Sequence, residues 1–147
     1  MPGEKAFLDS NVLIYAYSVD EPEKRVIAVS LCRSNPIISF QVLNEFSNVL
    51  LRKFCLNPTD VSAKLDELSG FMDIKIIDML TIKKALQLKD IYEYSYFDCI
   101  MLASALNSGC PVIYTEDLQH GQIIENRLKI IDPFLKKQRQ ASAHAKK

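Results

Sequence analysis

Short runs of consecutive apolar residues alternate along the chain with longer segments in which apolar residues recur every three or four positions. The short runs have the length of buried strands, and the longer periodicity is typical of helices with one buried face. We expect strands at 6–8, 37–39, 74–77, 110–114 and 128–131. We expect helices at 11–18, 23–32, 40–54, 59–72, 79–91 and 99–106, and a short helical turn closed by Gly121.

The order of these elements favours a parallel sheet. Helical segments separate all the expected strands, and no hairpin signal joins two of them. Such a chain is typical of a three-layer α/β/α domain, in which helices cover both faces of a mainly parallel central sheet. We assign residues 1–135 to this domain and predict that 136–147 form a basic, flexible C-terminal tail.

The net charge of the chain is zero, but the charge is unevenly distributed. Eighteen Lys and Arg residues balance eighteen Asp and Glu residues. Five of the basic residues lie in the tail, which contains no acid, so thirteen basic and eighteen acidic residues leave 1–135 with a net charge of −5. The body of the protein therefore lacks the basic character of a general nucleic-acid-binding domain.

Length and composition are those of an ordinary globular domain. The chain has 147 residues, of which 48% are hydrophobic and 24% charged. No apolar run reaches the ~18 residues needed to span a membrane. The first residues also lack the basic and apolar regions of a signal peptide. We therefore expect a cytoplasmic protein with no membrane partner.

Cysteines and histidines do not form a recognisable site in the sequence. No two cysteines form a C-x-x-C pair, and each lies in or beside an apolar segment, which predicts reduced, buried thiols. The cysteines are Cys32, Cys55, Cys99 and Cys110. The only histidines are His120 and His144, and neither has a partner at a spacing that favours catalysis by a histidine pair.

Four acids lie where predicted strands end or the following helices begin. Asp9 directly follows the first strand, and Asp117 follows the fourth. Glu45 lies beside the apolar stripe of the helix after the second strand, and Asp98 lies at the start of the strongly apolar helix at 99–106. The carboxyl ends of parallel strands meet at one edge of a sheet, where ligands commonly bind. These acids can therefore converge although they are far apart in the sequence.

Each acid taken alone also has an ordinary structural explanation. Asp9 could be a helix cap, Asp98 the capping-box partner of Ser95, Asp117 a turn residue, and Glu45 an exposed helix-edge residue. Four carboxylates at one edge repel one another unless a cation lies between them. Oxygen ligands suit Mg²⁺ or Mn²⁺, and such an ion can activate water and stabilise charge on a phosphate oxygen. The set together indicates metal-dependent hydrolysis of a phosphodiester.

Four stretches carry a resemblance to a known family. They are F-L-D-S-N-V-L-I-Y at 7–15, S-F-Q-V-L-N-E-F-S-N at 39–48, Y-F-D-C-I at 96–100 followed by Ala103 and Ala105, and Y-T-E-D-L-Q-H-G at 114–121. In this order they resemble the PIN-domain proteins, and specifically the VapC-type toxin ribonucleases of toxin–antitoxin pairs. The resemblance covers about 5–134, which is essentially the whole predicted domain.

The resemblance implies an endoribonuclease that depends on Mg²⁺ or Mn²⁺. The residues that match the family's catalytic and metal-holding acids are Asp9, Glu45, Asp98 and Asp117. Thr115 matches a hydroxyl residue that supports the fourth acid, whereas alternation along an extended segment turns Glu116 away from Asp117. The resemblance also implies a homodimer, a cognate antitoxin that blocks the site, and an RNA substrate for which transfer RNA is one candidate.

Two other readings of the acids stay open. A PIN-like module could bind protein or RNA without catalysis. A phosphoacceptor receiver domain would also place acids at a sheet edge, but it needs paired acids after the first strand and a lysine after the last. Here Ser10 follows Asp9, and Asp132 follows the last strand. Basic residues that could hold RNA, or simply face solvent, are Arg25, Arg52, Lys53 and Lys83.

Overall fold

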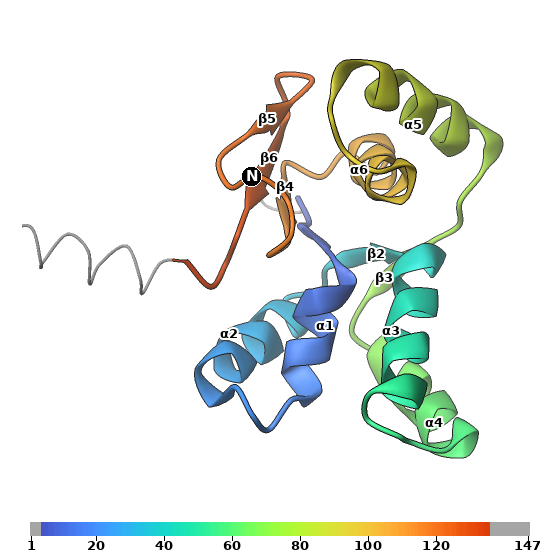
Figure 1. The fold of residues 1–147 in the computed structure, drawn as a ribbon, viewed down its shortest axis with the longest axis vertical. Coiled ribbons are helices and arrows are strands. Elements are labelled where there is room, and N and C mark those ends of the chain that lie inside the picture. The colour runs from blue at the N-terminus through green and yellow to red at the C-terminus, as the bar shows by residue number, and fades with distance from the viewer. Residues whose placement is uncertain (1–3, 136–147) are drawn as a thin grey trace, which may run out of the picture.

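A six-stranded sheet runs through the centre of the computed structural model, which describes residues 4–135 (Figure 1). Its strand order is β3-β2-β1-β4-β6-β5. The strands are β1 (Phe7–Leu8), β2 (Ile37–Ser39), β3 (Asp73–Lys75), β4 (Val112–Tyr114), β5 (Ile123–Ile124) and β6 (Leu128–Ile131). All neighbouring pairs are parallel except β5 and β6, which confirms a mainly parallel sheet. The predicted tail at 136–147 lies outside the described residues.

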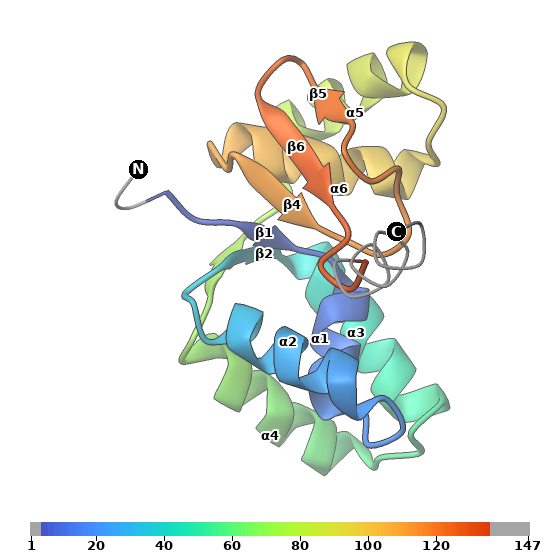
Figure 2. The same ribbon diagram turned by 90° about the vertical axis from the view of Figure 1, so that its left-hand side faces the viewer.

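Helices cover both faces of the sheet. They are α1 (Ser10–Tyr17), α2 (Pro22–Cys32), α3 (Phe40–Arg52), α4 (Pro58–Ser69), α5 (Met79–Ile91) and α6 (Tyr96–Asn107). Figure 2 shows α5 and α6 on one side of the strands and α1 to α4 on the other. The predicted three-layer α/β/α architecture is confirmed. Within 4–135, no helix is long and apolar enough to cross a membrane.

The innermost elements are β1 and α6. Phe7 of β1 is completely buried and pairs with Ile37 on one side and Ile113 on the other. The α6 residues from Cys99 to Leu106 are all buried, as expected for a helix that is apolar almost all round. This packing holds the carboxyl ends of β1, β2 and β4 side by side.

The start of α1 agrees with the capping role considered for Asp9, and the helix begins one residue earlier than predicted. Ser10 and Asn11 have the residue types of N-caps, but the helix begins at Ser10 and Asp9 is the N-cap. The Asp9 side chain accepts a hydrogen bond from the Ser10 backbone N–H at 2.6 Å. The side chains of Ser10 and Asn11 are therefore free for other contacts.

A β-hairpin at 123–131 corrects the expectation that no strands are joined by a tight turn. Glu125 and Asn126 have positive φ angles of 50° and 58°, and the Arg127 N–H donates to the Ile124 carbonyl at 3.1 Å. Two successive positive φ values define the turn that suits a two-residue hairpin. The sequence contains no glycine there to signal it.

Smaller corrections concern element ends and surface residues. No helical turn precedes Gly121, and β3 ends at Lys75, so Ile76 and Ile77 lie in the loop that follows. Cys55 is exposed, whereas the other three cysteines are buried, and all four are free thiols. Lys84, predicted to face solvent, forms a half-buried ion pair with Glu125.

Candidate active site

Three of the four predicted acids meet at the carboxyl edge of the sheet. Asp9 follows β1, Asp117 lies just beyond β4, and Glu45 lies in α3 directly after β2. Since β1 lies between β2 and β4 in the sheet, the segments that follow these strands leave the sheet as neighbours. The parallel order of the strands thus brings together side chains more than a hundred positions apart.

Asp9 is the buried centre of this group, with 5% of its surface exposed. Its Oδ2 accepts a hydrogen bond from the Thr115 hydroxyl at 2.7 Å, and Oδ1 accepts from the Ser10 N–H. Burial raises the pKa of Asp9 from 3.8 to about 6, against the lowering effect of these hydrogen bonds, and the charges of Asp117 and Glu45 raise it further. The negative charges of the three carboxylates are therefore close enough to oppose one another.

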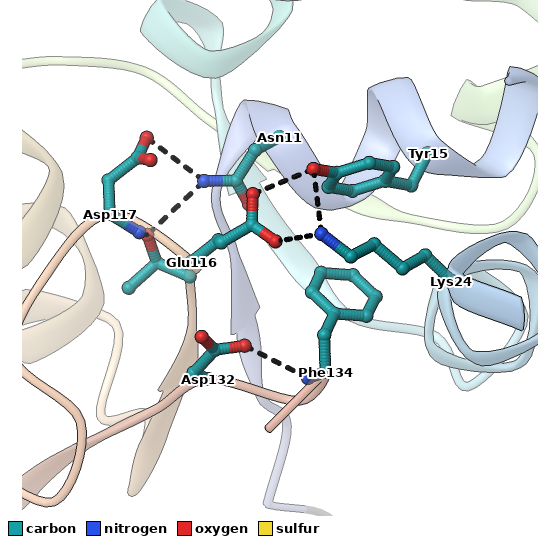
Figure 3. Close-up of polar contacts among 8 residues, drawn as sticks. Asn11, Tyr15, Lys24, Glu116, Asp117, Asp132 and Phe134 are labelled. Carbon is teal, nitrogen blue, oxygen red and sulfur yellow. Dashed lines mark hydrogen bonds and ion pairs between the residues drawn. The ribbon is translucent and has the colours of Figure 1, made fainter. Parts of the chain in front are cut away.

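Two neighbouring side chains at the start of α1 connect the acids. Asn11 Nδ2 donates to Asp117 Oδ2 at 3.1 Å (Figure 3). The same nitrogen also donates to Asp9 Oδ2 at 3.3 Å. Ser10 Oγ donates to Glu45 Oε2 at 3.0 Å and lies 3.3 Å from Asp9 Oδ1. Asp9 therefore shares one donor with Asp117 and another with Glu45.

Asp98 is not joined to this group by any side-chain contact within the described chain. Its backbone N–H donates to the Ser95 hydroxyl at 3.1 Å, which is the contact of the predicted helix cap. The connection to the other acids is indirect: Gln41 Nε2 donates to the Phe97 carbonyl at 3.0 Å and to Glu45 Oε1 at 3.3 Å. Gln41 therefore ties the start of α6 to the helix that carries Glu45.

The oxygen atoms at this site suit a divalent cation that keeps several bound waters. They do not form a closed cage of protein ligands around an ion. Within 4–135, no three His, Cys, Asp or Glu side chains form a ready-made metal-holding group. The four acids also form no ion pair with a described lysine or arginine. The buried amide oxygens Asn11 Oδ1 and Gln41 Oε1 have no hydrogen-bond partner and are further oxygen donors beside the carboxylates. Mg²⁺ typically binds one or two carboxylates and keeps several waters, so separated acids fit this ion.

The remaining predicted residues have clear positions. Thr115, predicted to support Asp117, is completely buried; its hydroxyl donates to Asp9 and accepts from the Asp117 N–H at 3.2 Å. His120 Nδ1 accepts from the Asp132 N–H at 2.9 Å, which gives this histidine a structural contact. The basic candidates are all exposed, and none makes an ion pair with the acids: Arg25, Arg52, Lys53 and Lys83.

Sequence reasoning did not find the bridging roles of Ser10, Asn11 and Gln41. Ser10 and Asn11 have residue types that are common at helix starts, and they occupy the first two positions of the otherwise apolar α1. Asparagine inside a helix is unfavourable. The sequence therefore held one signal for these bridging roles, namely two polar residues directly after an acid at the end of a strand.

Comparison with known proteins identifies the family. The model of the PIN domain family matches residues 6–126. The chain belongs to the PIN domain family. This confirms the family predicted from the four stretches. Comparison with the curated proteins gives no match.

Solved structures share the fold of this PIN domain. A toxin–antitoxin complex from Klebsiella pneumoniae aligns with a TM-score of 0.65 at 21% identity, over 88% of this chain and 98% of that one. VapC20 of Mycobacterium tuberculosis, a toxin that cleaves the sarcin-ricin loop, aligns with a TM-score of 0.61 at 21% identity, over 77% and 92%. FitAcB from Neisseria gonorrhoeae aligns with a TM-score of 0.65 at 15% identity, over 88% and 98%. At these identities the likeness establishes a common fold.

Proposed function

We propose that this PIN domain is a metal-dependent endoribonuclease and the toxin of a toxin–antitoxin pair. The observation that carries the proposal is the meeting of Asp9, Glu45 and Asp117 through the side chains of Ser10 and Asn11. These carboxylates have no cationic partner within 4–135, and the charges of Asp117 and Glu45 raise the pKa of Asp9. A divalent cation would relieve that repulsion. The shared fold with a toxin that cleaves RNA supports RNA as the substrate.

In this proposal, Asp9, Glu45, Asp98 and Asp117 hold Mg²⁺ or Mn²⁺. When bound, such an ion activates water for attack on the phosphorus and stabilises the leaving 3′ oxygen, which gives 5′-phosphate and 3′-hydroxyl ends. The chain's own residues keep the acids in place. Thr115 orients the Asp9 carboxylate, and Asn11 orients that of Asp117. Asp9 must lose its proton before it can hold the ion, because its pKa is raised to about 6.

A cognate antitoxin would block the same site, and the protein would act in the cytoplasm, where RNA is available. Several solved structures with this fold are toxin–antitoxin complexes, which supports such a partner. An acidic site without its own cation suits a partner that inserts a basic side chain. Transfer RNA is one candidate substrate.

The decisive experiment is cleavage of purified total RNA by the isolated protein. We expect cleavage with Mg²⁺ or Mn²⁺ and none with a chelator, with 5′-phosphates on the new ends. Asp98→Asn should lower the rate at least tenfold, because the loss of a ligand or of its support typically costs ~10–100-fold in activity. Asp66→Asn, which changes an exposed acid of α4, should cleave like the wild type.

No three acids form a ready-made metal-holding group within 4–135, which favours one second candidate, a PIN-like module that binds RNA or protein without catalysis. Under this alternative the wild type leaves RNA intact in Mn²⁺ yet retains it in a gel-shift assay. Equal cleavage by the wild type and Asp98→Asn would instead remove Asp98 from the catalytic set.

A homodimer is also part of the proposal, and an apolar surface supports it. A shallow groove of about 400 Å³ lies close to the acids and has no charged residue in its lining: Phe40, Gln41, Asn44, Ile76, Ile77, Phe97 and Ile100. Phe40, Ile76 and Phe97 are 48%, 74% and 63% exposed. Large side chains bury roughly 150–250 Å² each, so these three offer a few hundred Å² of the ~800 Å² that one partner commonly buries. Because an uncharged surface does not attract RNA, a second copy is the occupant we propose.

Ile76→Lys should convert the dimer into a monomer, because a charge placed in an apolar interface loses its hydration. Light scattering after size exclusion should give twice the chain mass of 16.7 kDa for the wild type and the single mass for the variant. Val26→Lys is a matched control, because Val26 of α2 is equally exposed, at 72% against 74% for Ile76. A monomeric wild type, or dissociation by both variants, would contradict this interface.

A further inference from the structure

A second polar cluster lies directly behind the acidic site. Glu116, between Thr115 and Asp117, points away from the acids toward α1 and α2 (Figure 3). Its Oε1 accepts from the Tyr15 hydroxyl at 2.7 Å, and its Oε2 lies 2.5 Å from Lys24 Nζ. This ion pair is half-buried, with side-chain exposures of 29% for Lys24 and 28% for Glu116.

Lys24 is held from several sides. Its Nζ donates to the Tyr15 hydroxyl at 3.1 Å and lies 4.6 Å from the centre of the Tyr15 ring. It also lies 5.4 Å from the Phe134 ring, which contacts the Tyr15 ring edge-on at 4.9 Å. The Glu116 carboxylate raises the pKa of Lys24 well above its usual range. The cluster of Tyr15, Lys24, Glu116 and Phe134 thus joins α1, α2, the segment after β4 and the chain beyond β6.

The cluster acts on the segment that carries Asp117. Residues 116–118 form a bend after β4, and Figure 3 shows the side chains of Glu116 and Asp117 leaving it in different directions, so an anchor on Glu116 also restrains the direction of Asp117. Asp117 itself is exposed, and Asn11 is the partner of its carboxylate within the described chain. The backbone of the segment is held at Thr115, whose N–H donates to the Ile131 carbonyl at 3.0 Å, and at Asp117, whose N–H donates to Thr115 Oγ1 at 3.2 Å. The Glu116 anchor adds a restraint through the side chain that lies between these two residues.

We propose that Glu116 is a positioning residue: with Lys24 and Tyr15 it holds the 115–117 segment so that Thr115 and Asp117 face Asp9. Its role in RNA cleavage rests on the proposed function, whereas its role in shaping the site does not. Residues that orient metal-holding side chains are commonly worth ~10–100-fold in metal affinity.

The chain contains a matched control for a purely structural ion pair. Lys84 of α5 and Glu125 of the β5–β6 turn lie 3.1 Å apart with side-chain exposures of 24% and 26%. Glu125→Gln therefore removes the same charge at a similar burial as Glu116→Gln, although Glu125 also lies 3.7 Å from Arg127. Any effect of net charge or of a lost ion pair on overall stability is common to both variants. An effect on the acidic site is expected only for Glu116→Gln.

The test combines two measurements on the full chain. Titration with Mn²⁺ should show roughly tenfold weaker binding for Glu116→Gln and no change for Glu125→Gln. Tyr15→Phe, which keeps the ring and removes one hydrogen bond to Glu116 without changing charge, should weaken Mn²⁺ binding by a smaller factor. In ¹⁵N spectra, the side-chain amide signals of Asn11 should shift in Glu116→Gln and stay unchanged in Glu125→Gln, because Asn11 reports the position of Asp117.

The outcomes separate this inference from the proposed function. Wild-type protein that binds no Mn²⁺ refutes the metal site, but the Asn11 signals still decide whether Glu116 positions Asp117. Folded Glu116→Gln with unshifted Asn11 signals and wild-type Mn²⁺ binding overturns the inference, and so does equal weakening by Glu125→Gln. If Glu116→Gln does not fold, Tyr15→Phe tests the inference by the same two measurements, Mn²⁺ binding and the Asn11 signals.

Discussion

Asp9→Asn should abolish RNA cleavage and, at neutral pH, make the metal-free protein more stable. The carboxylate is buried, and its pKa is raised from 3.8 to about 6, so ionised Asp9 destabilises the folded state. A shift of this size corresponds to at most about 3 kcal/mol. The introduced amide removes the charge, and its oxygen can still accept from Thr115 and Asn11 in the position of Oδ2. Its nitrogen then replaces Oδ1 and cannot accept from the Ser10 N–H or hydroxyl, and each lost hydrogen bond costs about 1 kcal/mol. We expect a net gain of about 1 kcal/mol, or roughly 3 °C in melting temperature.

The pH dependence of this gain has a definite sign. Between pH 3.8 and about 6 the folded protein binds more protons at Asp9 than the unfolded chain, so its stability falls as pH rises through this window. The advantage of Asp9→Asn should therefore be absent below pH 3.8 and complete above about pH 6. Thermal unfolding of both proteins in chelator across this range measures it.

Cleavage by the same variant should fall about a hundredfold or more, because Asp9 is central to the proposed metal site. The two effects are opposite in direction, so loss of folding cannot explain loss of activity. Asp66→Asn serves again as the control and should change neither quantity. A variant that is less stable at every pH, or one that cleaves like the wild type, would show that Asp9 has only a structural role as the cap of α1.

Mn²⁺ should raise the melting temperature of the wild type by about 8 °C at a hundredfold excess over its dissociation constant. Binding to the folded state alone contributes about 2.7 kcal/mol at that excess, and a domain of this size gains roughly 3 °C per kcal/mol. At pH 5 most of the Asp9 carboxyl is protonated, because its pKa is about 6. The ion must then displace the proton, which weakens apparent binding about tenfold and removes about half of the shift.

Scanning fluorimetry at pH 5 and 7.5 with increasing MnCl₂ measures these shifts. Asp9→Asn should lose most of the shift at pH 7.5, and the surface variant Asp66→Asn should retain it. No shift at millimolar Mn²⁺, or an equal shift in both variants, would count against Asp9 as a metal-holding residue.

Much of the fold followed from the apolar pattern. The spacing of apolar residues, every second position in a strand and every three to four in a helix, determines which segments can bury one face. For example, α5 spans the predicted residues, 79–91. The hairpin of β5 and β6 escaped prediction because β5 has two residues and its turn contains Glu125 and Asn126 in place of glycine. A turn of this kind is stabilised by the strands it joins, and local sequence does not reveal it.

The candidate site was predictable in outline for a topological reason. Parallel strands place their carboxyl ends at one edge, so an acid at the end of each of several strands is enough to expect a cluster. Asp9, Glu45 and Asp117 fulfil that expectation through shared donors, while no shared donor links Asp98 to them within 4–135. The position of Asp98 depends on how α6 packs, and the spacing of acids in the sequence does not contain that information.

The sequence by itself determined the elements, the parallel sheet, the family and the edge at which the acids lie. Only the tertiary structure decided what connects them: Ser10 and Asn11 between the carboxylates, and Tyr15 and Lys24 anchoring Glu116 behind them. The physical reason is the range of each interaction. Periodicity and strand order are properties of the chain, whereas a hydrogen bond between residues a hundred positions apart depends on ångström-scale packing.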